Sequence, residues 1–171
     1  ASKMQNKVAS NLVILAVSNL INSMRLFIDG DKAAGELALL GAFYSGIIQN
    51  LNLVGPAHAL AHNMPSVSHA VATGFLLPNV ILMQAEKSKE VCLKYNQLAQ
   101  QIGFSNIEDL LEEIYTKLLP QLKIKPKISN FAKSDIDFET VSSAALLDNL
   151  ARFFAVEMKQ EDLIKILKTS W

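Results

Sequence analysis

The sequence predicts an all-α, multi-helix bundle that forms one domain over residues 1–171. Half of the residues are hydrophobic and 19% are charged, which is apolar for a soluble chain. Apolar residues recur at three- to five-residue steps, as in Val8–Phe27, and no segment alternates like a strand. A chain of 171 residues suits one domain with a sizeable core. We expect the apolar excess to include a face that a partner domain covers.

Turn and cap residues divide the chain into the expected helices. Asp29-Gly30-Asp31 should form a turn and cap a helix over 32–51, whose small residues, including Gly41 and Gly46, predict close packing against another helix. Gly55-Pro56 should start a short helix, and Pro78 should kink the later helix that contains it. The other predicted segments are a turn at 63–66, a helix over 88–102 closed by Gly103, a helix over 108–119 with a capping box from Ser105, a loop over 120–131, and helices over 140–154 and 160–168.

Composition argues against several functions. Sixteen basic residues balance sixteen acidic ones, so the chain has no electrostatic reason to bind nucleic acid or an anionic membrane. Residues 11–26 are apolar but are interrupted by Ser18, Asn19 and Asn22, and we expect a core helix here because a membrane span needs roughly 20 apolar residues. The single cysteine, Cys92, excludes an internal disulfide and four-cysteine zinc sites and indicates a reducing, cytoplasmic setting.

The three histidines of the chain, His58, His62 and His69, fall within twelve residues. His58 and His62 are four residues apart and therefore share a helix face, and imidazole is a suitable ligand for zinc and iron. A zincin protease would need a glutamate directly after the first histidine, where this chain has Ala59. From the residues alone, histidines satisfied within a helical core are the alternative to a metal site.

The histidine segment resembles the signature of iron-containing alcohol dehydrogenases. The two similar stretches are Gly55-Pro-Ala-His58-Ala-Leu-Ala-His62 and His69-Ala-Val-Ala-Thr-Gly-Phe-Leu-Leu-Pro78. The preceding Asp31-Lys-Ala-Ala-Gly35-Glu36 and the acidic tail that closes on Trp171 are also similar to the family. The resemblance covers nearly the whole chain. It implies the helical C-terminal, metal-binding domain of this family, which belongs to the dehydroquinate synthase-like superfamily.

The resemblance also implies roles for the histidines. His58 and His69 match the last two metal ligands of the family, and His62 matches an active-site histidine that lies beside the substrate and the nicotinamide. The implied reaction is hydride transfer between NAD(P) and an alcohol or aldehyde carbon, assisted by Fe²⁺ or Zn²⁺ as a Lewis acid. A positioned histidine would help to move the proton.

Parts of the family pattern have no counterpart in these residues. The family's other two ligands are an Asp and a His four residues apart, and the sequence contains no Asp-x-x-x-His and no Gly-rich βαβ unit. Two histidines are fewer than the three protein ligands of a usual catalytic site. We therefore expect residues 1–171 to be inactive alone. The expected partners are an N-terminal dinucleotide-binding domain, a small alcohol or aldehyde, and further copies of the chain in a homo-oligomer.

Three departures and two alternatives accompany the resemblance. The loop between His62 and His69 is shorter than is usual, Ala70 stands where the family has Gly, and Thr73 stands where it has Asn.

One alternative is a dehydroquinate-synthase-like lyase domain, but the acid and lysines that such sites carry do not accompany His58 or His69. The other is a non-catalytic helical interaction module derived from the family.

Overall fold

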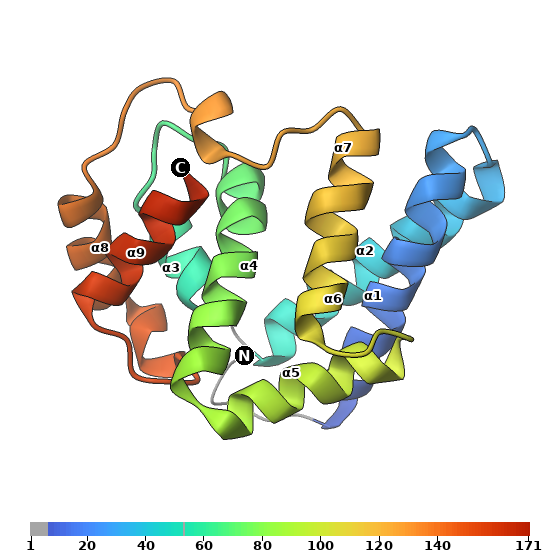
Figure 1. The fold of residues 1–171 in the computed structure, drawn as a ribbon, viewed down its shortest axis with the longest axis horizontal. Helices are drawn as coiled ribbons and strands as arrows, with labels where there is room; N and C mark the ends of the chain where they lie inside the picture. Colours follow the sequence, from blue (N-terminus) through green and yellow to red (C-terminus); the bar gives the residue numbers. More distant parts are fainter. Residues whose placement is uncertain (1–6, 53) are drawn as a thin grey trace. The chain divides into compact units, whose positions relative to one another are not determined.

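The computed structural model describes residues 7–52 and 54–171, and these residues form helices and no strand, which confirms the all-α prediction. The α-helices are α1 (Lys7–Ile28), α2 (Lys32–Asn52), α3 (Pro56–His62), α4 (His69–Lys87), α5 (Lys89–Gln101), α6 (Ile107–Glu112), α7 (Leu119–Gln121), α8 (Phe138–Leu147) and α9 (Gln160–Ser170) (Figure 1). The shorter elements are a π-helical turn, η1 (Glu113–Leu118), and the 3-10 turns η2 (Ile128–Asn130) and η3 (Asn149–Phe153).

The chain divides into two compact units. Within the described residues, one unit comprises 54–93 and 125–171 and is called the histidine unit here. The other comprises 7–52 and 94–124 and is called the hairpin unit, after helices α1 and α2. Helix α5 has residues in both. The single domain over 1–171 that the sequence predicts stays a prediction.

Helices α1 and α2 pack side by side in the hairpin unit (Figure 1). As predicted, a turn joins them: Gly30 has a φ of +96°, which glycine adopts without strain. The Asp31 carboxylate accepts hydrogen bonds from the backbone N–H groups of Ala33 and Ala34, at 2.9 and 3.2 Å. Asp31 is therefore the N-cap that the sequence predicts for α2.

The prediction that residues 11–26 form a core helix was wrong. Only 11% of the most apolar window of Val8–Ile28 is buried, and Leu15 and Phe27 are each about half exposed. Helix α1 is also long and apolar enough to cross a membrane, contrary to the expectation from its polar residues. One such helix near the start of a chain is weak evidence for a span, because core helices and signal sequences share these properties.

The helix predicted over 108–119 is longer and less regular than expected. Its N-cap is Asn106 rather than Ser105, since the Asn106 side chain accepts from the backbone N–H of Asp109 at 2.9 Å. The helix then continues through η1 into α7, where Pro120 occupies a first-turn position that needs no N–H donor. The predicted loop over 120–131 is confirmed for residues 122–127, whereas α7 and the short η2 occupy residues on either side of them.

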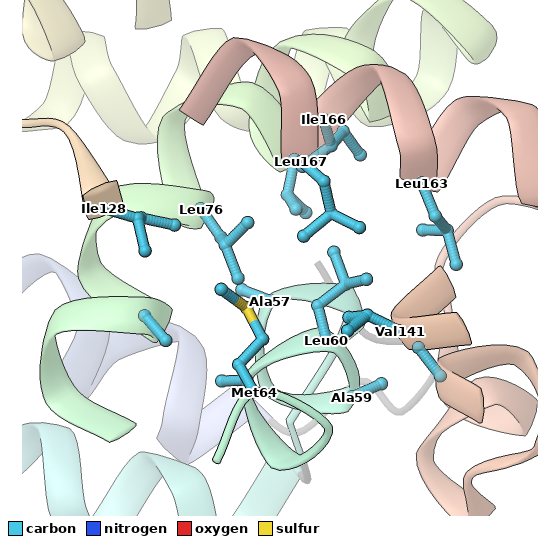
Figure 2. Close-up of a cluster of buried hydrophobic side chains, with 14 of the residues drawn as sticks. Ala57, Ala59, Leu60, Met64, Leu76, Ile128, Val141, Leu163, Ile166 and Leu167 are labelled. Carbon is cyan, nitrogen blue, oxygen red and sulfur yellow. The ribbon is translucent and has the colours of Figure 1, made fainter. Parts of the chain in front are cut away.

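A buried apolar core lies within the histidine unit. Side chains from α3, α4 and α9 point toward a common centre in Figure 2. The largest fully buried apolar side chains of the core come from these helices, from the loop after α3 and from η2: Leu60, Met64, Leu76, Ile128, Leu163, Ile166 and Leu167. Helix α4 runs through Pro78 to Lys87, so proline does not end it, and the kink expected at Pro78 stays a prediction. Helix α9 matches the helix predicted over 160–168 and extends to Ser170.

The continuous helix predicted over 140–154 was wrong. Helix α8 begins at Phe138, capped by Asp137, and ends at Leu147. Asp148 then adopts extended backbone angles, φ −62° and ψ 141°, before η3. The Asp148 side chain accepts a hydrogen bond from the backbone N–H of Leu150 at 2.8 Å. A side-chain bond of this kind competes with helical hydrogen bonding and explains why the helix stops here.

Candidate functional site

Helix α3 places two of the three histidines on its less buried face. Gly55 is its N-cap and Pro56 is at the first helical position, as the sequence predicts. Ala57, Leu60 and Ala61 are buried in the core, whereas His58 is half-buried and His62 is exposed. The packed side of α3 therefore fixes the direction in which its histidines point.

The short loop 63–68 returns the chain to the start of α4, where His69 is the first residue. Met64 and Val67 are buried in the core and anchor the loop. The carbonyl oxygen of Ser66 accepts a hydrogen bond from the backbone N–H of Lys133 at 3.0 Å. These contacts hold His69 close to the histidine face of α3.

The structure brings the three imidazole rings together. The ring centroids of His58 and His69 lie 5.0 Å apart, with an interplanar angle of 61°. His62 lies 5.4 Å from His69, and these two rings are stacked at 25°.

Burial controls the protonation of His58. Desolvation, with smaller contributions from the charges of His69 and His62, lowers the pKa of His58 to about 4. Its imidazole is therefore neutral at neutral pH, which is the form that binds metal.

His62 has a carboxylate partner that the sequence did not indicate. Its Nδ1 lies 3.1 Å from Oδ2 of Asp148, 86 residues further along the chain. The Asp148 side chain is 18% exposed and that of His62 is 46% exposed. The backbone N–H of Leu150 and, less strongly, His62 hold the pKa of Asp148 below its usual value despite partial burial. The only signal in the sequence was Asp148-Asn149, a possible cap inside an otherwise apolar stretch.

The ring spacing of His58 and His69 is close to that of two imidazoles that share one metal ion. Two imidazoles bound to one ion at about 2.1 Å and a near-tetrahedral angle have ring centroids about 5 Å apart, which matches the 5.0 Å between them. Within residues 7–52 and 54–171, no group of three or more His, Cys, Asp or Glu side chains is placed to hold an ion. The pair therefore suits a site to which other groups contribute.

Two other residues singled out in the sequence, Thr73 and Cys92, lie on helices α4 and α5. Thr73, at the position where the family has Asn, donates its hydroxyl hydrogen to the carbonyl oxygen of His69 at 2.8 Å. Its side chain is thus satisfied within α4. Cys92 is half-buried on α5.

Comparisons with solved structures show a shared fold. An iron-containing alcohol dehydrogenase from Thermococcus thioreducens superposes with a TM-score of 0.87 at 24% identity, over 99% of this chain and 46% of that one. A 1,3-propanediol oxidoreductase superposes with a TM-score of 0.82 at 21% identity, over 99% of this chain and 47% of that one.

Sequence comparisons agree. A lactaldehyde reductase of Escherichia coli is 28% identical over 171 residues, which cover 94% of this chain and 44% of that protein. An alcohol dehydrogenase of Thermococcus barophilus is 24% identical over 166 residues, covering 94% of this chain and 43% of that one. The chain thus spans less than half the length of these relatives. The model of the Fe-containing alcohol dehydrogenase family, C-terminal, matches residues 1–171. The chain therefore belongs to the iron-containing alcohol dehydrogenase family and corresponds to its C-terminal domain.

Proposed function

We propose that this chain is the metal- and substrate-side domain of an NAD(P)-dependent, metal-activated alcohol dehydrogenase. The observation that carries the proposal is the convergence of His58 and His69, whose rings lie 5.0 Å apart. These residues lie on different helices, α3 and α4, and the match to the family model spans the segment that contains both.

His58 and His69 would hold Fe²⁺ or Zn²⁺ together with ligands from outside this chain. When bound, the ion supplies Lewis acidity that stabilises negative charge on the substrate oxygen. Burial of Ala57, Leu60 and Ala61 keeps α3 fixed, so the ligand pair is preorganised before the ion arrives.

His62 would carry the proton. Its side chain is 46% exposed, and its Nδ1 is paired with Asp148. The remaining ring nitrogen, Nε2, would take the proton of an alcohol substrate and pass it to solvent, or do the reverse for an aldehyde. This role requires contact with the substrate, not with the ion.

The nicotinamide cofactor would be bound by an N-terminal domain, since the chain spans 44% of the lactaldehyde reductase. Residues 1–171 alone should be inactive. The names of two similar proteins, a lactaldehyde reductase and a 1,3-propanediol oxidoreductase, support a small alcohol or aldehyde as substrate. A homo-oligomeric, cytoplasmic enzyme remains part of the proposal.

The test uses the full-length protein with the double change His58→Ala and His69→Ala. We expect loss of bound metal, measured by mass spectrometry of the eluted ion, and loss of NAD(P)-dependent alcohol oxidation. A double change of two exposed residues of the same unit, Glu157→Ala and Lys168→Ala, is the control and should keep both. Retained turnover in the histidine variant would contradict the dehydrogenase proposal.

The same experiment tests the two alternatives. A non-catalytic interaction module would be indifferent to the loss of both histidines. A dehydroquinate-synthase-like lyase would lose its metal but would show no NAD(P)-dependent alcohol oxidation before the change. The match to the alcohol dehydrogenase model favours the dehydrogenase over the lyase.

A further inference from the structure

We propose that Asp148 is a positioning residue that holds His62 in the tautomer with its hydrogen on Nδ1, leaving Nε2 as the proton acceptor. The inference deepens the proposed function and rests on it for the role of His62. The pairing itself rests only on the geometry of the histidine unit.

The Asp148 carboxylate is held from two sides. One oxygen, Oδ1, accepts from the backbone N–H of Leu150 at 2.8 Å, and the other, Oδ2, lies 3.1 Å from Nδ1 of His62. The backbone of Asp148 is also fixed, because its own N–H donates to the carbonyl oxygen of Ala144 at 3.0 Å. Asp148 thus lies between α8 and η3, and each of its carboxylate oxygens has a hydrogen-bond partner.

A carboxylate imposes one tautomer on the imidazole. A neutral imidazole has one donor nitrogen and one acceptor nitrogen, whereas an ionised carboxylate only accepts. Nδ1 of His62 must therefore carry the hydrogen that it donates to Asp148, and Nε2 keeps its lone pair. A base that is oriented by a third group in this way is a recurrent arrangement in proton transfer.

Substitution by asparagine separates this role from helix capping. Asparagine has nearly the same shape as aspartate but only one acceptor oxygen. If that oxygen keeps the bond from Leu150, the amide NH₂ faces Nδ1 of His62, and two donors would meet. In Asp148→Asn the imidazole should therefore move its hydrogen to Nε2, with the cap intact.

The first readout is the tautomer of His62. The full-length protein is labelled with ¹⁵N at its histidines and studied by NMR without added metal, in mildly alkaline buffer, where free imidazole is neutral. The variant His62→Gln assigns the signals. We expect Nδ1–H in the native protein and Nε2–H in Asp148→Asn. Asp148→Ser, which can cap η3 but is too short to reach His62, should also show Nε2–H, the form that free histidine favours. The same tautomer in the native protein and in Asp148→Asn would overturn the inference.

The second readout is turnover of the metal-loaded enzyme. Asp148→Asn should lower kcat roughly 10- to 100-fold with KM nearly unchanged. The matched control is Asp137→Asn, because Asp137 caps α8 through a bond from the backbone N–H of Glu139 at 3.0 Å but pairs with no histidine. This control should keep its turnover. Full turnover in Asp148→Asn despite a changed tautomer would overturn the positioning role.

The proposed role of His62 and the selection of its tautomer by Asp148 can be refuted separately. Full turnover in His62→Gln would refute the proposed role of His62 and leave Asp148 nothing to position for catalysis. The NMR result would still show whether the Asp148 carboxylate selects the tautomer.

Discussion

Gly41 of α2 lies directly against the backbone of Ala16 in α1. A Cβ added to Gly41 would stand 2.9 Å from the Ala16 carbonyl oxygen and 2.9 Å from Cγ of Leu20. A Cβ added to Gly46, five residues further along α2, would have no atom of another helix within 4 Å. The two glycines share a helix and differ only in their surroundings.

We expect Gly41→Ala to destabilise the hairpin unit by about 1–3 kcal/mol, because the neighbouring carbonyl cannot yield without moving the backbone of α1. Gly46→Ala should instead stabilise it by up to about 1 kcal/mol, through higher helix propensity. Urea unfolding followed by far-UV circular dichroism measures both. Equal effects of the two changes would contradict the close packing of α1 and α2.

The second prediction concerns the apolar core of the histidine unit, against which α3 packs. Leu60 is fully buried on α3 between His58 and His62, whereas Leu147 is 86% exposed. Leu60→Ala should cost about 2–5 kcal/mol by leaving a cavity, and Leu147→Ala should have little effect. Because Trp171 lies in the histidine unit, its fluorescence during unfolding reports the change. A small loss for Leu60→Ala would mean that α3 is not packed as described.

The stability of the histidine unit should depend on pH through Asp162. Its carboxylate lies 2.7 Å from Nζ of Lys87 and also accepts from the backbone N–H of Lys159 at 2.7 Å. Partial burial disfavours its charge, but the hydrogen bonds from Lys87 and Lys159 outweigh this effect and hold the pKa of Asp162 below its usual value.

Because the pKa of Asp162 is lower in the folded state, its charge stabilises the fold at pH values above the pKa of the unfolded side chain, about 4. This contribution is lost as the pH falls below that value. Asp162→Asn should therefore cost about 1 kcal/mol at neutral pH and progressively less below about pH 4. Melting temperatures across this range measure the difference. Asp135→Asn, which removes an exposed carboxylate of the same unit, is the control. Its difference in melting temperature from the native protein should not change with pH.

Exposed apolar side chains on α1 and α2 predict self-association of residues 1–171. Leu39 is 73% exposed and Phe43 is 63% exposed, and their spacing of four residues places them on one face of α2. Replacing both by glutamate should shift the chain toward monomer in sedimentation velocity. Leu147→Glu, a charge added at an exposed leucine of the other unit, is the control. A native chain that is already monomeric would refute this prediction.

Local patterns in the sequence were sufficient for much of the secondary structure. Asp31, Gly55-Pro56 and Gly103 mark helix ends because capping and positive φ are properties of single residues and their neighbours. The clustering of His58, His62 and His69 was also visible, since three histidines in twelve residues stand out in an apolar chain. For the same reason, the family resemblance could be read from the order and spacing of these blocks.

Tertiary structure decided what local patterns could not. Residues 11–26 have the composition of a core helix, yet exposure depends on what packs against α1, which no helical period encodes. The break at Asp148 followed from competition between a side-chain cap and the next helical turn, which the periodicity of the sequence does not decide. The contact of Asp148 with His62 joins residues 86 positions apart. Residue types and spacing thus determined that histidines gather on α3 and α4. Only the fold decided how the rings are placed and which carboxylate His62 contacts, because such contacts depend on the packing of α3 against α8 and η3.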